Sequence, residues 1–214
     1  MTLTEHLSRF NGATDEVFLQ RKFEELAPVF LYGGYLQVRN DYQVFIRTVE
    51  FYYHSEKADG IHDPIVYHRN GRNLEVVPYF PLMTLHAHAS GFDITFENEE
   101  GAYRASALIR AYEVKDKEGK YLIWKKNDEE GKYMFHRQSD YGFNNQSTYL
   151  YSLLNGFSLE GANTIQWIDA PRSQVTDLLM KTRKNVFKSE DEWTYRPTKI
   201  QCGRKWSFTR IDKI

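Results

Sequence analysis

The sequence predicts one α+β domain with a curved, mainly antiparallel sheet and flanking helices, on three observations. First, 214 residues are enough for one domain with a substantial core, and no internal repeat or Pro/Gly-rich linker divides the chain. Second, hydrophobic residues make up 41% and aromatic residues 15%, which is typical of a folded, sheet-rich protein. Third, hairpin-like turns rather than helical crossovers separate most of the strand-like runs. We therefore treat residues 1–214 as a single domain.

A long helix is expected near the N-terminus. Thr14 is a candidate N-cap, and the apolar residues of the run Asp15–Leu26 fall roughly on one side of a helix. Pro28 and the glycine pair at Gly33 predict where this helix ends. Two more helices are expected over Ser147–Gly156 and Arg172–Asn185.

The remaining apolar runs are predicted as strands. They are Tyr35–Val38, Tyr42–Tyr53, Thr84–His88, Phe92–Glu97, Ala105–Tyr112, Tyr121–Trp124, Tyr133–Arg137, Lys199–Cys202 and Lys205–Ile211. The stretches "KDKEGK" and "NDEEGK" resemble hairpin turns. Because Tyr42–Tyr53 is apolar on both faces, we expect it to be an interior strand.

Glu50 is the first candidate for chemistry. Strict alternation along its strand places Glu50 on the same face as Val44 and Ile46, where an ionised carboxylate is costly unless it is compensated. A partly desolvated glutamate suits general acid–base work. The alternative is that Arg47 or Arg110 simply neutralises it, and the residues alone leave both interpretations open.

The histidines suggest a second kind of site. His86 and His88 lie two apart on a predicted strand and therefore face the same way, which is one route to a metal chelate. Further ligands could come from His54, His62, His68 and Asp63. The alternative is that the pair faces solvent, because the sequence has no HExxH motif and only one cysteine. Nucleotide-cofactor and serine-hydrolase motifs are absent from the sequence as well.

Positive charge concentrates in the C-terminal part of the chain. From Lys181 onward there are ten basic and four acidic residues, although the net charge of the whole chain is −1. Such a segment can follow a phosphate backbone, and the alternative is a solvated strand surface. The candidate phosphate contacts are Arg183, Lys184, Arg196, Lys199, Arg204 and Lys205.

The sequence contains no signal for export or membrane insertion. The N-terminal stretch "MTLTEHLSRFNGATDE" lacks a basic start followed by an apolar core, and no apolar run approaches the ~20 residues that span a bilayer. The single cysteine, Cys202, allows no internal disulfide. We therefore expect a cytoplasmic protein without a membrane partner.

Four stretches, in order along the chain, carry a resemblance to a known family. They are "FEELAPVFLYGGYLQVR", "VEFYYHSEKADGIH", "TLHAHASGFDITFENEEGAYRASALIRAYE" and "EWTYRPTKIQCGRKWS". They resemble the opening helix, the catalytic strand, the pocket strands and a late Glu-Trp…Pro stretch of the methylpurine (alkyladenine, or 3-methyladenine) DNA glycosylases. The chain is accordingly similar to a divergent member of that base-excision-repair family.

The resemblance implies an activity and assigns roles to residues. Members of the family flip a damaged purine out of duplex DNA and hydrolyse its N-glycosidic bond. Glu50 matches the general base and Arg110 the active-site arginine. Tyr52 matches an aromatic residue beside the flipped base, and His62 matches a histidine that hydrogen-bonds it. These types suit the chemistry, because a carboxylate can stabilise an oxocarbenium-like sugar and deprotonate water.

The sequence also departs from the family pattern. His86 and His88 stand where the pocket strand has tyrosines, and Glu97 stands where it has an asparagine. Near Ser90 the tyrosine that fills the gap left by the flipped base is missing. Two functions therefore remain open. One is a monomeric, cofactor-independent DNA glycosylase acting on duplex DNA, and the other is a non-catalytic or histidine-metal-binding relative of the same fold.

Overall fold

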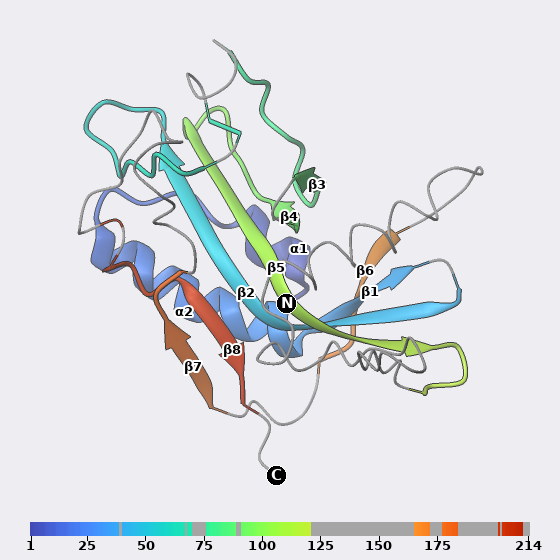
Figure 1. The fold of residues 1–214 in the computed structure, drawn as a ribbon. Helices are drawn as coiled ribbons and strands as arrows, with labels where there is room; N and C mark the ends of the chain where they lie inside the picture. Colours follow the sequence, from blue (N-terminus) through green and yellow to red (C-terminus); the bar gives the residue numbers. More distant parts are fainter. Residues whose placement is uncertain are drawn as a thin grey trace, which may run out of the picture.

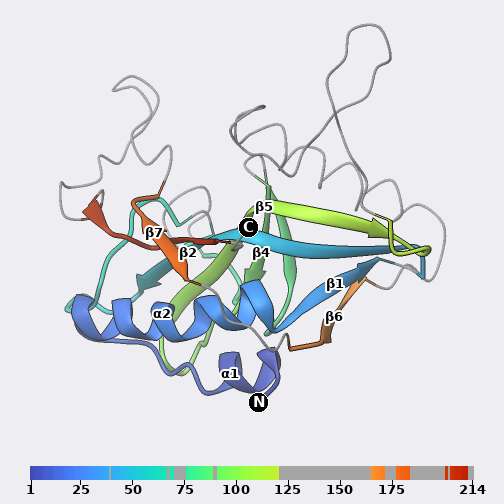
Figure 2. The same cartoon turned by 90° about the horizontal axis from the view of Figure 1, so that it is seen from below.

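The computed structural model describes residues 1–38, 40–66, 68–69, 76–88, 91–120, 165–171, 177–183, 201 and 203–211. Within these residues two helices lie on one face of an eight-stranded sheet (Figures 1 and 2). The helices are α1 (Leu3–Ser8) and α2 (Glu16–Tyr32). The strands are β1 (Gly34–Val38), β2 (Tyr42–Ser55), β3 (Leu85–His88), β4 (Gly91–Thr95), β5 (Tyr103–Asp116), β6 (Ile165–Asp169), β7 (Leu178–Lys181) and β8 (Ser207–Arg210). The predicted α+β class is confirmed.

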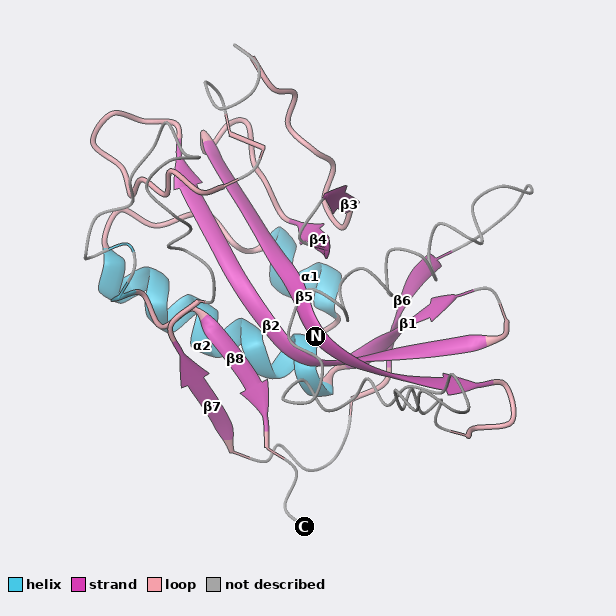
Figure 3. Cartoon of the chain, in the orientation of Figure 1, coloured by secondary structure: helices cyan, strands magenta, loops and turns pink. Residues whose placement is uncertain are grey.

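The sheet is built around two long strands, β2 and β5. Its main order is β3-β4-β5-β2-β1-β6, and all of its described pairings are antiparallel. β5 runs along one side of β2, while β1 and then β8 occupy the other side. The predicted interior position of this strand is therefore confirmed. Figure 3 shows both long strands bending midway, with the helices behind them.

The helix α2 begins one residue later than predicted and continues past Pro28, but it ends at the predicted glycine pair. Its N-cap is Asp15, whose side chain accepts a hydrogen bond from the backbone of Phe18, instead of Thr14. The helix then continues through Pro28 to end at its C-cap Gly33. A proline inside a helix removes one backbone hydrogen bond. Here the last turn of the helix buries Phe30 and its neighbours in the core, and this packing outweighs the loss.

The hydrophobic core lies between α2 and the sheet. Aromatic rings dominate it, with Phe23 stacked on Phe51 at 4.6 Å between ring centroids and Phe30 edge-on to Phe51 at 5.6 Å. Trp206, just before β8, contacts Phe23 from the side. The C-terminal strand is therefore anchored to the same core as the N-terminal helix.

A bulge in β2 changes which face Glu50 occupies. The pairing of β2 with β5 shifts register on both sides of Thr48, which offsets the alternation of side chains by one residue. Val44 and Ile46 point into the core before the bulge, whereas Val49 and Phe51 do so after it. The expectation that Glu50 shares a face with Val44 and Ile46 is therefore wrong. Glu50 lies on the opposite face of the sheet, away from α2.

Other elements differ from the prediction because pairing outweighs local preference. The run Arg172–Asn185, predicted as a helix, contains β7, which pairs antiparallel with β8. β6 was not predicted at all and pairs with β1, where a side chain at Gly34 would meet the carbonyl of Ile168. The elements predicted over Tyr121–Trp124, Tyr133–Arg137 and Ser147–Gly156 lie outside the described residues, as does all but one residue of the strand predicted at Lys199–Cys202.

Among the described residues, no helix is long and apolar enough to span a bilayer.

Candidate active site on the polar face of the sheet

The face of the sheet opposite the helices is buried yet polar, and we call it the polar face. After the bulge, alternation gives it Glu50 and Tyr52 from β2. Ser106 and Arg110 come from the neighbouring strand β5, and Asp93 comes from β4. All of these except the partly buried Tyr52 are almost fully buried. Buried polar groups are costly unless they bond to one another, so this face is organised by hydrogen bonds and ion pairs.

Glu50, Tyr52 and Arg110 form a closed triangle of hydrogen bonds. Nε of Arg110 donates to Oε2 of Glu50 at 2.8 Å, and the Tyr52 hydroxyl donates to the same oxygen at 3.0 Å. Nη2 of Arg110 in turn donates to the Tyr52 hydroxyl at 3.1 Å. The carboxylate is 1% exposed and the guanidinium 4%. Arg110 therefore supplies the compensating charge for Glu50, while Arg47 pairs with Glu113 at 3.4 Å instead.

The electrostatics of this triangle keep Tyr52 protonated. Burial raises the pKa of Tyr52 far above its ordinary value, and the negative charge of Glu50 adds to the effect. The phenol is therefore a permanent hydrogen-bond donor to Glu50 at physiological pH. A fixed donor and a fixed cation on one oxygen hold the carboxylate in a single orientation.

Arg183 covers the ring of Tyr52. Its guanidinium carbon lies 4.8 Å from the centroid of the Tyr52 ring and 4.9 Å from that of Trp206. Nη1 of Arg183 is 2.5 Å from Oδ2 of Asp63, and the side chains of both are fully buried. The sequence marked Arg183 as a candidate phosphate contact, but the fold places it inside this network.

Arg204 is held at the edge of the same network. Its guanidinium forms an ion pair with Glu16 at the start of α2 and lies 3.7 Å from Oδ2 of Asp63. It also donates to the carbonyl of His62 at 3.2 Å. Arg204 is thus nearly buried, and of the predicted basic contacts that the structure describes, only Lys205 is exposed. Lys184, Arg196 and Lys199 lie outside the described residues.

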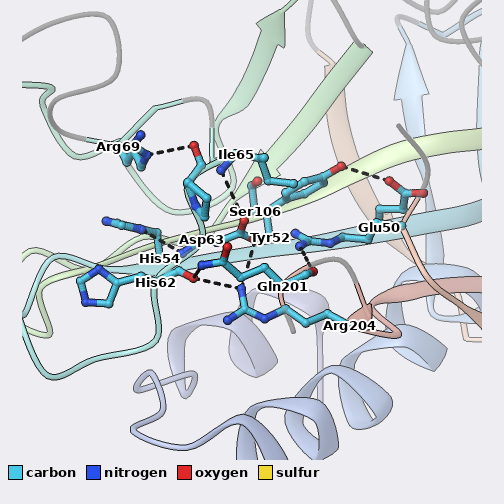
Figure 4. Close-up of polar contacts among 12 residues, drawn as sticks. Glu50, Tyr52, His54, His62, Asp63, Ile65, Arg69, Ser106, Gln201 and Arg204 are labelled. Carbon is cyan, nitrogen blue, oxygen red and sulfur yellow. Dashed lines mark hydrogen bonds and ion pairs between the residues drawn. The ribbon is translucent and has the colours of Figure 1, made fainter. Parts of the chain in front are cut away.

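The side chain of His62 does not join Glu50. In Figure 4, Glu50 and His62 lie at opposite ends of the cluster, with Tyr52 and Asp63 between them. His62 is exposed, its Nε2 is 3.0 Å from the carbonyl of Lys57, and its ring contacts the ring of His54. The structure therefore brings together three of the four residues matched to the glycosylase family and leaves the fourth at the surface.

His54 is a buried neutral histidine that makes stability depend on pH. Its Nδ1 accepts a hydrogen bond from the backbone N–H of Asp63 at 3.1 Å. Burial lowers the pKa of His54 to about 4, although the nearby carboxylate of Glu56 opposes this. In the unfolded chain the pKa is about 6.5, so between these values the unfolded state binds more protons and folding weakens as pH falls.

We expect the free energy of unfolding to drop by about 3 kcal/mol between pH 6.5 and pH 4 through His54 alone, at ~1.4 kcal/mol per pKa unit. His54→Asn keeps an acceptor oxygen for the Asp63 N–H but cannot titrate, so it should flatten the pH profile in that window. His62→Asn, at the exposed neighbour, is the matched control. Urea unfolding at several pH values measures the free energy of unfolding of all three proteins. Equal profiles for wild type and His54→Asn would contradict the assignment.

Glu97 belongs to a second buried cluster on the polar face. Its carboxylate accepts hydrogen bonds from the backbone of Phe80 at 2.8 Å and from Arg104 at 3.2 Å, and it contacts Nδ1 of His68. His86 packs its ring against Phe80 at 4.7 Å and against His68 at 5.5 Å. Glu97 and His86 therefore both contact Phe80 and His68, which form a cluster distinct from the Glu50 triangle.

The two clusters meet through Asp93 and Ser106. The Ser106 hydroxyl donates to Oδ2 of Asp93 at 3.2 Å, and Ser106 is directly opposite Tyr52 in the sheet. Oδ2 of Asp93 is also 4.0 Å from Nε2 of His68. In the described part of the chain, no three His, Cys, Asp or Glu side chains are arranged to hold a metal ion. The side chain of His88 and the whole of Ser90 lie outside that part.

Sequence reasoning missed two members of the Glu50 network. Asp63 appeared only as a possible metal ligand, and Arg183 only as a phosphate contact. They are 120 positions apart, and no local pattern links them. Asp63 and Arg183 pair because the tertiary structure brings the segment after β7 beside the loop after β2.

The comparisons with known proteins identified no relative of this chain. No protein-family model matches the sequence, and the comparisons with curated proteins and with solved structures found no match either. The resemblance to methylpurine DNA glycosylases therefore rests on the four sequence stretches alone.

Proposed function

We propose that this protein is a monofunctional DNA glycosylase that flips a damaged purine from duplex DNA and hydrolyses its N-glycosidic bond. The observation that supports this most is the triangle of Glu50, Tyr52 and Arg110. These residues match the family's general base, base-stacking aromatic and active-site arginine, and the fold brings all three within hydrogen-bonding distance.

In the proposed mechanism, Glu50 acts on water and on the sugar. Its carboxylate deprotonates the water that attacks C1′ while its charge stabilises the oxocarbenium-like sugar. Arg110 and Tyr52 fix the carboxylate, so no reorganisation is needed as charge develops. The departing purine takes up one proton from solvent while Glu50 holds the proton removed from water, so it leaves as the free base. An abasic site remains without strand cleavage. Hypoxanthine and 3-methyladenine are the lesions to assay first.

A second candidate is a non-catalytic relative, and the burial of the site favours it. Glu50 is 1% exposed, and Arg183 already covers one face of the Tyr52 ring, so a flipped base could stack only on the other face. In this alternative the polar network only fixes the packing of the loops over the sheet. Excision assays on lesion-bearing duplexes, with chelator in one arm, distinguish the two candidates. Release of a modified purine supports the enzyme, and no release from any lesion supports the non-catalytic relative.

Lys205 gives a test of the DNA-binding part of the proposal. We expect binding to duplex DNA to weaken steeply with salt, and Lys205→Gln to reduce the slope of log K against log[salt] by about 1, because one phosphate contact is lost. The matched control is Lys120→Gln, which removes the same charge from an exposed site beyond the far end of β5. Fluorescence anisotropy at several salt concentrations measures the slopes. Equal slopes for both variants, or no binding at low salt, would remove Lys205 from the proposed interface.

A further inference from the structure

Hydrogen bonds and an ion pair join the loop after β2 to the segment after β7 beside Tyr52. The carbonyl of His62 accepts hydrogen bonds from Nε2 of Gln201 at 2.8 Å and from Nη1 of Arg204 at 3.2 Å. Arg183 donates through Nη1 to the carboxylate of Asp63, and through Nη2 to the carbonyl of Gln201 at 3.2 Å. The position of Arg183 is thus fixed by a buried carboxylate and by backbone.

These contacts extend to the aromatic ring of Tyr52 in the candidate site. The guanidinium of Arg183 contacts the rings of both Tyr52 and Trp206, at distances typical of cation–π contacts. The planar guanidinium can stack and pair with a carboxylate at the same time, which a lysine ammonium cannot. The hydroxyl at the other end of the Tyr52 ring donates to Glu50. A continuous series of contacts therefore runs from Asp63 to the proposed general base.

We propose that Asp63 and Arg183 are positioning residues of this site. Asp63 fixes the guanidinium of Arg183, which fixes the Tyr52 ring and, through its hydroxyl, the orientation of the Glu50 carboxylate. The inference rests on the proposed glycosylase function for its kinetic consequence, but the contact itself can be measured without activity. Neither residue touches the scissile bond in this mechanism.

The kinetic test compares Asp63→Asn and Arg183→Lys with Glu113→Gln. The control also removes the carboxylate partner of a buried arginine, Arg210, but Glu113 lies on β5 outside the contacts of Asp63 and Arg183. We expect the first two variants to lower kcat for excision about 10–100-fold with little change in KM, because a displaced general base loses rate and not substrate affinity. Glu113→Gln should keep kcat within about threefold of wild type. Equal losses in all three variants, or a change confined to KM, would overturn the inference.

Combination with Glu50→Gln separates positioning from general damage. Residues that act through one group are not additive, so Asp63→Asn should lower the residual activity of Glu50→Gln by less than about twofold. A full additional loss would show that Asp63 acts independently of Glu50 and would contradict the proposal.

The structural test uses the NMR signals of ring-labelled tyrosine, with Tyr52→Phe to identify the Tyr52 resonance. Asp63→Asn and Arg183→Lys should both shift that resonance, and Glu113→Gln should leave it in place. If wild type excises no base but this pattern is observed, the proposed function fails and the contact stands. If the Tyr52 resonance is unmoved in both folded variants, the inference fails whatever the activity. Having two variants covers the case in which one of them does not fold.

Discussion

Glu50→Gln should lower the excision of hypoxanthine or 3-methyladenine from duplex DNA by about 10²–10⁴-fold, the usual contribution of a positioned general base. The substitution keeps the shape of the side chain but removes both the base and the negative charge beside the sugar. DNA binding should be retained, because glutamine has the shape of glutamate and the substitution leaves the exposed basic side chains unchanged. Single-turnover release of the free base measures the rate, and anisotropy measures the binding.

The matched control for this experiment is Glu113→Gln on β5. Glu113 also pairs with arginines, Arg47 and Arg210, but makes no contact with Tyr52 or Arg110. Its activity should stay close to that of wild type. Excision that survives Glu50→Gln and disappears with chelator would replace this mechanism with a metal-dependent one, in which the histidines of β3 are the first candidates as ligands.

Arg110→Met should destabilise the protein by about 3–5 kcal/mol, the typical cost of leaving one partner of a buried ion pair without the other. Arg110 is 4% exposed and donates to both Glu50 and Tyr52, so its loss removes a cation that is paired with a buried carboxylate. The expected result is a lower urea midpoint with an unchanged dependence on denaturant. Arg47→Met is the control, because its partly exposed pair with Glu113 should contribute only about 0–1 kcal/mol.

The double variant Arg110→Met/Glu50→Gln identifies the source of that loss. With the carboxylate neutralised, no buried charge remains in the triangle, so the double variant should recover a large part of the stability lost in Arg110→Met. It should remain inactive, because it lacks the general base. If the two substitutions simply add, the ion pair is not what stabilises this face, and packing of the long side chains is the better explanation.

The sequence by itself determined the class of fold and pointed to the three residues of the Glu50, Tyr52 and Arg110 triangle. Apolar residues on both sides of the run Tyr42–Tyr53 predicted an interior strand, and this is what β2 is. The same strand carries Glu50 and Tyr52, and Arg110 is one of the two arginines predicted as possible partners of Glu50. Periodicity and residue type are local properties, so the sequence contains them in full.

Only the tertiary structure decided which way these side chains point and which charges pair. The bulge at Thr48 moves Glu50 to the face opposite Val44 and Ile46, because one extra residue in a ladder offsets every later side chain. Arg183, basic in sequence, becomes a buried partner of Asp63 because two distant segments meet over β2. Register and long-range pairing depend on contacts between segments far apart in the chain, which no local pattern specifies.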